Sequence, residues 1–508
     1  MVLVKSDVCQ TKWVIGNRFD DIPEGHVSRF LLDFTNEFLG NSLDENFVEK
    51  PGRPIYPKKT LLNILIYGEI NRISSTEELA DLVKYHHFYN FVADDATPSA
   101  RTLRRFKEDY GYLFEFILQS TLIRAKNNEI TDFDHIAIDG TIIKANNSNY
   151  NVIKLEEIEL LLKLLNQNKS EINKYLKSDE GKNLRKSAYK LLKNKNKTQQ
   201  EKIDLLKNLK DILLESEQSS IGLSDSDARW MKNKKNQTEL GFNVQSSVDH
   251  KSKLILVFEA TQDPTDHNQL INQIKNIKNV LGEYPTKISA DYGYRTHENL
   301  KFLKFKDIDG YIPNQKQSRE NKGKEPDNLY HKDYFIYDEE IDAYICPENQ
   351  VLPYQRQYTY QKRPRRMYYT KKCKNCPVKK KCTKSNWRTI SEFGDYIEKE
   401  MKIKMDSTEG KEEYSKRMST VEPVFGILKK QHNLNELEQR KMDRIQTELN
   451  LMAAAYNIKQ LHAHKIKNKK EKERVLEKNL ENLQTDFQTR FPNGNLEINF
   501  VNQKKKKS

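Results

Sequence analysis

Three acidic residues are the clearest candidates for chemistry in this sequence. Asp139 ends the apolar part of a strand-like run at 135–144, Asp291 ends another at 287–291, and Glu422 lies among basic residues and a tyrosine in 414–429. Carboxylates at the ends of buried strands are costly unless something cationic compensates them. Because carboxylate oxygens are hard ligands, three of them suit a pair of Mg²⁺ ions. Paired metal ions support in-line displacement at phosphorus, so the sequence predicts phosphodiester chemistry.

The elements that would position these residues are two strands and a helix. Side chains at the carboxyl ends of central strands in a mixed sheet project into the cleft where ligands bind. If the strands ending at Asp139 and Asp291 are neighbours, their carboxylates converge, and Glu422 would come from a helix laid against that edge. The alternative is that Asp139 with Gly140, and Asp291 with Gly293, form simple turns, because Asp and Gly both favour turns.

The order of expected elements is that of a mixed α/β sheet. Apolar periodicity changes from helix to strand near 135, and a turn at 249–253 joins two strands into a predicted hairpin. The expected elements are strands at 135–145, 240–249 and 254–260, a helix at 266–281, a strand ending at 291, a helix at 296–304, a strand at 310–313, a loop at 314–330 and helix again over 407–464.

The changes of pattern divide the chain into segments. They are a helical N-terminal DNA-binding or dimerisation domain (1–130), the start of the sheet domain (131–150), a helical insertion (151–235), the continued sheet domain (236–325), a Cys-rich basic insertion (326–392), C-terminal helices with Glu422 (393–465) and a charged tail expected to be disordered (466–508). In the helical insertion, a coiled arm used for packing or self-association is favoured.

Composition leaves a nucleic-acid partner open without requiring one. The 508 residues include 87 Lys and Arg against 73 Asp and Glu, a net charge of +14. A polyanionic partner would suit this excess, but so would a soluble Lys-rich protein. No apolar run approaches the roughly 20 residues of a membrane span, and no signal peptide is visible. Five cysteines, an odd number, indicate reduced thiols or metal ligands, and a cytoplasmic location is expected.

Two basic regions are candidates for DNA contacts. The first is the polar side of a predicted helix, which carries Arg101, Arg104 and Arg105. It is compatible with a helix-turn-helix reader of duplex DNA and also with the solvated face of a bundle helix. The second is the aromatic and basic run 358–369, with Arg363, Arg365 and Arg366. Its cations could bind the phosphate backbone.

Four of the five cysteines gather in the second insertion: Cys346, Cys373, Cys376 and Cys382. Four thiols could close a tetrahedral Zn²⁺ site, and because four thiolates leave no open position for water, its role would be structural. The spacing shows only one two-residue knuckle, so four reduced thiols remain the alternative. Cys9 stands alone and has no assigned role.

Four motifs, in this order, resemble those of a known family. They are IDGT at 138–141 followed by Lys144 and Ala145, GFNVQ at 241–245, SADYGY at 289–294 and VEPVFGILK at 421–429. On these motifs the chain resembles the DDE transposases of bacterial insertion sequences, most nearly the insertion-sequence family numbered eleven-eighty-two. The similarity covers nearly the whole chain, including the segment around Tyr56 and Pro57 and the cysteine-rich insertion.

The resemblance implies an α/β fold in which a ribonuclease-H-like mixed sheet carries a helical N-terminal domain, a helical insertion and a Cys-rich insertion. It implies that Asp139, Asp291 and Glu422 are catalytic and bind two Mg²⁺ ions, for which Mn²⁺ can substitute. It also implies that three further residues, Tyr414, Arg417 and Lys429, hold the transposon end near the scissile phosphate.

The residue types agree with these roles, with one departure. Arg417 can clamp a phosphate bidentately, Lys429 can act as a point charge and Tyr414 can stack on an unpaired base. Pro423, however, is expected to break or restart the helix, so that Arg417, Glu422 and Lys429 would not share one helical face.

The function that follows from the resemblance is DNA transposition. The protein would cleave at the ends of its own element and join them to target DNA, acting on double-stranded DNA as a homodimer or larger assembly, at the bacterial nucleoid and away from membranes. One alternative is a nuclease of the same fold that does not join strands. Another is a non-catalytic DNA-binding protein derived from a transposase, against which the intact acidic triad argues.

Overall fold

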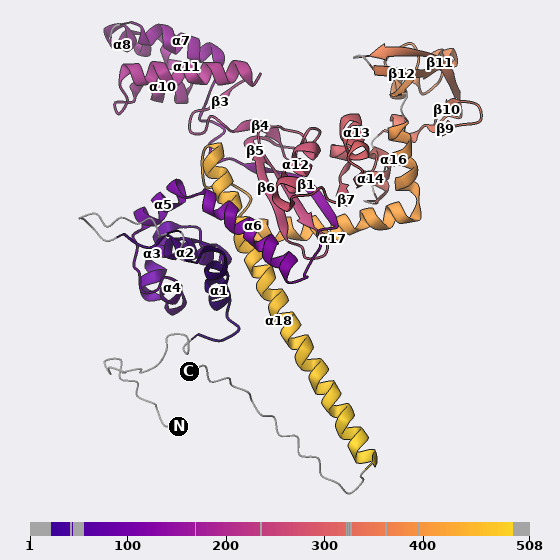
Figure 1. Cartoon of the computed structure of the whole chain (residues 1–508). Helices are drawn as coiled ribbons and strands as arrows, with labels where there is room; N and C mark the ends of the chain where they lie inside the picture. The colour runs from indigo at the N-terminus through magenta and orange to yellow at the C-terminus, as the bar shows by residue number, and fades with distance from the viewer. Residues whose placement is uncertain are drawn as a thin grey trace, which may run out of the picture.

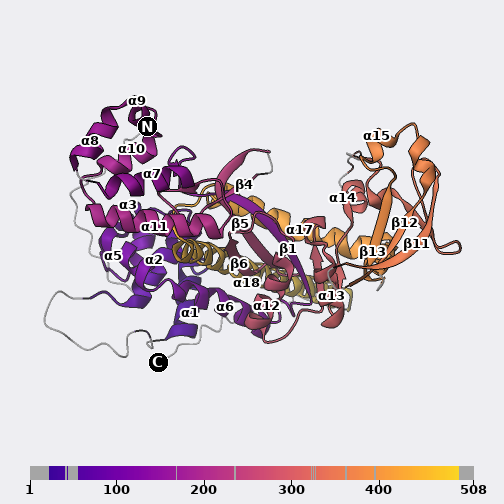
Figure 2. The ribbon, with the colours of Figure 1, turned by 90° about the horizontal axis from the view of Figure 1, so that it is seen from above.

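A computed structural model of the chain describes residues 22–490, apart from 41–42, 44–54, 168, 234–235, 322, 324, 326–327, 361–362 and 394–395. Cys9 and the last part of the tail, 491–508, lie outside the described residues. Figure 1 shows a central sheet crossed by long helices, and Figures 1 and 2 both place the helical insertion and the Cys-rich insertion at opposite ends of that sheet.

The central sheet forms around β1, in which Ile136, Ala137 and Ile138 are buried. On one side β5 pairs antiparallel with β1 and β6 antiparallel with β5; on the other, β7 pairs parallel with β1 and β8 parallel with β7. The order β6–β5–β1–β7–β8 confirms the predicted mixed sheet of ribonuclease-H-like type. The strands are β1 (His135–Lys144), β4 (Arg229–Lys232, which pairs with the start of β5), β5 (Thr238–Asp249), β6 (Ile255–Thr261), β7 (Lys287–Ala290) and β8 (Asp309–Tyr311).

Helices cover both faces of this sheet. α17 (Thr408–Gln431) packs across β1, β5, β7 and β8, and it contacts Asp139 and Thr141, which point to one face of β1. α12 (Gln269–Leu281) packs on β5 and β6. Gly140 points to the other face of β1, where Asp266, just before α12, lies against it. Residues 139 and 141 therefore belong to the α17 face.

The predicted break at Pro423 is wrong, because α17 is continuous through it. A proline inside a helix costs about 3 kcal/mol, since it removes one backbone hydrogen bond and crowds the preceding turn. Pro423 is exposed, so the carbonyl group it leaves unpaired can bond to water. Val424, Phe425 and Leu428 are buried just beyond it. Burying such side chains contributes about 1.5–3 kcal/mol each, which outweighs the loss.

The N-terminal helices and the last helix close one edge of the sheet. α18 (Met442–Arg490) packs against α2, α6 and β6. The side-chain amide of Asn457 donates to the carbonyl of Ile255 and accepts from its N–H, both at 2.8 Å, and so takes the place of a neighbouring strand. The N-terminal helices are α1 (Val27–Leu39), α2 (Lys58–Ile70), α3 (Thr76–Tyr85), α4 (His87–Val92), α5 (Ala100–Asp109) and α6 (Tyr112–Asn127).

The tail differs from expectation, since α18 carries helix through 466–490, a segment predicted to be disordered. Within the described residues, no helix has the length and apolar character that crossing a membrane requires.

The helical insertion has a hydrophobic core of its own, separate from the main one and built on Ile158, Leu161, Leu206 and Leu209. This agrees with the helical insertion predicted at 151–235. Its elements are β2 (Val152–Ile153), α7 (Leu155–Leu165), α8 (Lys169–Lys177), α9 (Asp179–Lys182), α10 (Lys186–Lys193), α11 (Gln199–Glu215) and β3 (Ile221–Gly222).

The segment at 314–330, predicted to be a loop, contains the helix α14 (Gln315–Asn321). Asn314 and Gln317 cap its start reciprocally, each side chain accepting from the other's backbone N–H at 2.9 Å. Beside it lie η1 (Tyr292–Tyr294), α13 (His297–Phe305) and α16 (Ile397–Asp406).

The Cys-rich module, residues 332–393, forms a separate five-stranded sheet in the order β13–β12–β11–β10–β9. Its elements are η2 (Lys332–Tyr334), β9 (Ile336–Asp338), β10 (Ala343–Ile345), β11 (Val351–Tyr360), β12 (Arg363–Tyr369), η3 (Lys371–Asn375), α15 (Lys379–Cys382) and β13 (Thr389–Phe393).

Candidate active site

Asp139 and Asp291 occupy equivalent positions on neighbouring strands. Ile138 of β1 pairs in parallel register with Ala290, the last residue of β7, so the next step along both strands sets Asp139 beside Asp291. Residues aligned in this way point to the same face of a parallel pair. The fold thus brings together two of the three predicted acids, on the face that α17 covers.

The turn alternative is wrong for Asp139, because β1 continues past it to Lys144. Asp291 does begin a turn. Its Oδ1 accepts a hydrogen bond from the N–H of Tyr292 at 2.7 Å, capping η1, and another from the hydroxyl of Ser318 in α14 at 3.2 Å. Capping and alignment with Asp139 are compatible, since the turn starts where β7 ends.

A buried arginine compensates the charge of Asp139. Arg417 in α17 is 3% exposed, and its Nη2 lies 2.8 Å from Oδ1 of Asp139, which is 14% exposed. Burial alone would lower the pKa of Arg417, but the nearby Asp139, Tyr414 and Asp291 outweigh it and raise that pKa. The guanidinium therefore stays charged and compensates the negative charge of Asp139.

Tyr414 lies beside this ion pair and is also buried. Burial raises the pKa of Tyr414, the positive charge of Arg417 lowers it, and the charges of Asp291 and Asp139 raise it further, so the hydroxyl stays neutral. In this arrangement the ring is covered and cannot stack on a base, and Arg417 is engaged with Asp139. The DNA contacts predicted for these two residues are therefore not available on the surface.

Glu422 is exposed and lies on a different side of α17 from the buried Arg417. It precedes Lys429 by about two helical turns, so both lie on the same flank. Lys429 reaches β1, where its ammonium donates to Oγ1 of Thr141 at 2.7 Å. Since Arg417 and Lys429 both contact β1 close to Asp139, the stretch of α17 that carries Glu422 lies alongside the same part of the strand.

The three acids do not form a closed ligand set in this arrangement. Among the described residues, no group of three or more His, Cys, Asp or Glu side chains is placed to hold a metal ion. Asp139 and Asp291 are aligned, whereas Glu422 points outward on the flank of α17. A side-chain movement of Glu422 toward β1 would be needed to complete the predicted triad.

The structure also contains a polar network on the opposite face of β1, which the sequence analysis does not predict. Oδ1 of Asp266 accepts from the amides of Asn243 at 2.9 Å and Gln245 at 2.8 Å, and Tyr294 donates to Oε1 of Gln245 at 2.5 Å. A Cβ atom on Gly140 would come within 2.3 Å of the Gln245 amide nitrogen and 2.5 Å of the Asp266 carboxylate. Glycine at 140 therefore lets this network pack directly under Asp139.

The network ties the strands that carry the two acids. Asn243 and Gln245 lie on β5, beside β1, and Tyr294 lies in the turn that follows Asp291. The helix predicted to begin at residue 266 begins at Gln269, with Asn268 as its N-cap, so Asp266 lies before the helix and bonds to the sheet. The GFNVQ motif, with two polar side chains in an otherwise apolar strand, was the available signal.

A second ionic cluster lies at the beginning of β1. His135 contacts Oε2 of Glu413 in α17 at 3.2 Å through Nδ1 and the hydroxyl of Ser289 at 3.1 Å through Nε2. Burial lowers the pKa of His135 to about 4, although Glu413 acts in the opposite direction; His250, Lys416 and Lys287 lower it further. His135 is therefore neutral and holds α17 against β1 and β7.

The basic surfaces are partly as expected. On α5, Leu103 and Phe106 are buried and the three arginines 101, 104 and 105 are exposed, with Arg104 paired to Glu77. In the Cys-rich module the charges of two arginines serve its own packing: Arg366 pairs with Asp342, and Arg365 lies over the ring of Phe393. Among the described residues, the exposed cations of the module are Lys332, Arg356 and a group of lysines at 371, 372, 374, 380, 381 and 384.

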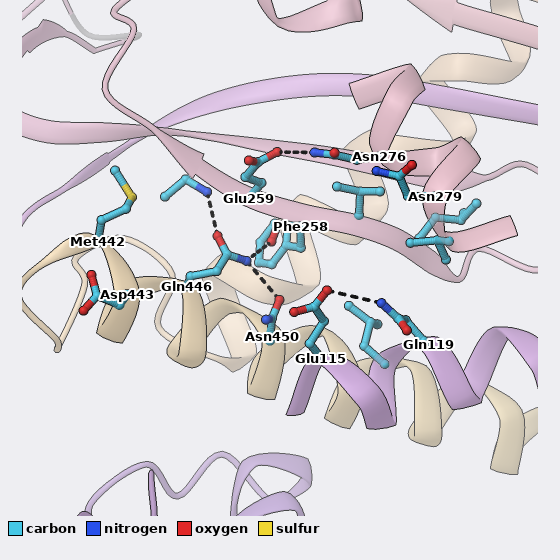
Figure 3. Close-up of a pocket in the computed structure, with 15 residues that line it drawn as sticks. Glu115, Gln119, Phe258, Glu259, Asn276, Asn279, Met442, Asp443, Gln446 and Asn450 are labelled. Carbon is cyan, nitrogen blue, oxygen red and sulfur yellow. Dashed lines mark hydrogen bonds between the residues drawn. The ribbon is translucent and has the colours of Figure 1, made fainter. Parts of the chain in front are cut away.

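A cavity of about 440 Å³ lies apart from the acids, between α6, β6, α12 and α18 (Figure 3). Its polar groups bond largely to one another, as in the contact of Glu259 with the amide of Asn276 at 2.8 Å. None of the residues predicted from the sequence lines it.

Comparisons with known proteins agree with the sequence motifs. Two family models match, a "Transposase domain (DUF772)" over residues 17–109 and a "Transposase DDE domain" over residues 345–462. The second match includes Tyr414, Arg417, Glu422 and Lys429. It begins after Asp139 and Asp291 and therefore includes neither of them. A solved structure described as the piggyBac transposase synaptic complex with hairpin DNA is similar at 10% identity with a TM-score of 0.31, over 87% of this chain and 73% of that chain. No curated protein matches significantly.

Proposed function

We propose that the chain, which two transposase family models match over residues 17–109 and 345–462, cuts DNA at the ends of a mobile element and joins those ends to target DNA. The observation that carries this proposal is the alignment of Asp139 with Asp291 on parallel strands beneath α17, the helix that bears Glu422. Aligned carboxylates at this edge of a sheet suit phosphodiester chemistry.

The donor types of the three acids suit a pair of divalent ions, provided that the side chain of Glu422 turns toward β1 to join the other two. The donors are carboxylates, which Mg²⁺ prefers and Mn²⁺ also accepts. Asp139 is mostly buried, so its carboxylate requires a cation nearby, and in this structure the guanidinium of Arg417 supplies it. We assign Asp139, Asp291 and Glu422 as the metal ligands. Bound metal would activate a water molecule or a 3′-hydroxyl and stabilise the leaving oxygen.

The other polar residues of α17 have distinct roles in this proposal. Lys429 is partly exposed on the flank of Glu422 and can balance a phosphate of the transposon end. Arg417 and Tyr414 are positioning residues in the free protein, since they hold the charge and place of Asp139. They would reach DNA only if α17 shifts on binding.

Duplex DNA is the proposed partner, both as element ends and as target. The exposed arginines of α5 and the exposed lysines of the Cys-rich module supply cations at separate parts of the molecule. Such cations bind phosphates without reading sequence. Two ends must be brought together, so we propose a homodimer or larger assembly on DNA; the piggyBac complex named above contains hairpin DNA.

The mechanism is tested by Mg²⁺-dependent cleavage of a DNA end. The wild type is compared with Asp139→Ala, Asp291→Ala and Glu422→Ala, and with the control Glu412→Ala, an exposed acid earlier on the same helix. Loss of cleavage of at least about 10²-fold is expected for the three ligand variants and no loss for the control. Undiminished metal-dependent cleavage by any ligand variant would remove that residue from the proposed site.

Strand joining is tested separately, because a nuclease of the same fold would also cleave. A plasmid assay with labelled ends should yield joined products with the wild type. Cleavage without joined products would favour the nuclease, and DNA binding without cleavage would favour a non-catalytic protein. Terminal inverted repeats flanking the coding region would support transposition.

A further inference from the structure

The Cys-rich module has too small an apolar core for its size. Its five strands are held by only five buried hydrophobic side chains within the described residues: Phe335, Ala343, Leu352, Tyr368 and Ile390. Domains with so little core are usually stabilised by disulfides or a structural metal. The described cysteines are all free, so disulfides do not supply this stability.

The four cysteines of the module surround one small cavity. Cys346 follows β10, Cys373 and Cys376 lie in and just after η3, and Cys382 ends α15. All four line the same space, together with Phe335 and Leu352 of the core. Its volume of about 20 Å³ is close to that of a single water-sized sphere. Three separate segments of chain therefore direct thiols at a space that fits one small ion.

The backbone around Cys346 fixes the position of its sulfur. The chain turns back on itself at 346–350, where the N–H of Asn349 donates to the carbonyl of Cys346 at 2.8 Å and Asn349 adopts a φ of +57°. The turn aims the N–H of Gln350 at the sulfur of Cys346, at 3.2 Å. The turn therefore holds the sulfur of Cys346 at the wall of the cavity.

Four thiolates would repel one another unless a cation lay between them. Among the described side chains, no three are placed in a metal-binding geometry, so a bound ion would draw the thiols closer together.

We propose that Cys346, Cys373, Cys376 and Cys382 bind one structural Zn²⁺ ion, which fastens η3 and α15 to the sheet of the Cys-rich module. Soft thiolates select Zn²⁺ over the Mg²⁺ that suits the carboxylates, so the two sites take different metals. Four thiolates leave no open position, so this ion takes no part in cleavage. Each thiol releases its proton on binding.

Fastening η3 and α15 also orders the exposed lysines that these segments carry. Lys371, Lys372 and Lys374 lie in η3, and Lys380 and Lys381 in α15. Loss of the ion would release both segments from the sheet and with them this basic surface.

The metal content of the purified full-length chain is the first test. About one zinc per chain is expected for the wild type after dialysis against a weak chelator, and the same for Cys9→Ser, which changes the cysteine outside the module. Cys373→Ser and Cys382→Ser should retain less than about a tenth of that zinc. Replacement by Co²⁺ should give the thiolate-to-metal absorption of a tetrahedral site. Absence of zinc from the wild type together with no Co²⁺ absorption would overturn the proposal.

A measurement on the wild type covers the case in which the serine variants fail to fold. A strong chelator should increase hydrogen–deuterium exchange in β11, β12, η3 and α15, while β1 and β5 keep their protection. Unchanged exchange in the module would mean that the thiols are simply reduced cysteines. The outcome is independent of the transposase proposal, because neither readout involves DNA cleavage.

Discussion

Replacing Arg417 by methionine tests whether the buried ion pair holds the place of a metal ion. The substitution keeps an unbranched apolar stem but removes the cation that lies 2.8 Å from Asp139. Because Arg417 is 3% and Asp139 14% exposed, the carboxylate would be left largely desolvated without that partner. Removing one member of a buried pair costs about 3–5 kcal/mol, so Arg417→Met should lower the free energy of unfolding by that amount.

Magnesium should restore part of this loss. Arg417 and a metal ion compete for the same carboxylate, so the variant should bind Mg²⁺ more tightly than the wild type. Bound ligand stabilises by about 2.7 kcal/mol at a concentration of 100 times its Kd, and each tenfold gain in affinity adds about 1.4 kcal/mol. Urea unfolding with and without Mg²⁺ should therefore show the gap between variant and wild type closing by about 1–3 kcal/mol.

The matched control is the double variant Asp139→Asn, Arg417→Met. It has neither charge, so in the absence of metal it should be more stable than Arg417→Met alone, and Mg²⁺ should stabilise it less. The reasoning is refuted if Mg²⁺ leaves the gap unchanged, or if the double variant is no more stable than the single one.

Three further perturbations test the elements around the site. Gly140→Ala should lower the free energy of unfolding by about 1–3 kcal/mol, because its Cβ would overlap a packed polar network. The control Gly293→Ala should be nearly neutral, because its Cβ would stay 3.4 Å from the nearest atom. Equal unfolding midpoints for the two variants would contradict this prediction. His135 has a folded pKa of about 4, below its ordinary value of 6.5, so its contribution is complete above pH 6.5 and is lost as the pH falls toward 4, by at most about 3 kcal/mol. His135→Asn should flatten the stability profile in that window, and an unchanged slope would exclude the histidine as its cause. Asn457→Ala leaves the buried backbone N–H and carbonyl of Ile255 unpaired and should lower the free energy of unfolding by about 1–3 kcal/mol. Hydrogen exchange should become faster first in β6. Uniformly faster exchange across the sheet would contradict a role of Asn457 at the edge of the sheet.

The sheet and the alignment of two acids could be predicted because their signals are local. Short apolar runs ending in Asp139 and Asp291, and a hairpin turn at 249–253, mark strands and their ends directly. The partners of each strand are distant in sequence, and here the resemblance to a family supplied the order that periodicity alone does not.

The missed features depend on contacts that no local pattern contains. Arg417 looks like a surface cation in the sequence, and its burial follows only from the packing of α17 over Asp139. Asp266 bonds to Asn243 and Gln245, more than twenty positions away, so its role could not be read from its helix. The helix break predicted at Pro423 follows from the backbone effect of proline alone, whereas buried apolar side chains beyond Pro423 keep the helix continuous.

The closure of β6 by α18 has a consequence for the order in which the protein is made. Asn457 is synthesised 202 residues after its partner Ile255. Until it leaves the ribosome, the nascent sheet exposes an unpaired edge, a site at which chains associate wrongly. A chain cut short after residue 422 would contain all three acids and still lack this closure. Completion of translation is thus a condition for a stable sheet domain, and truncated copies should lack the proposed activity without any change at the acids themselves.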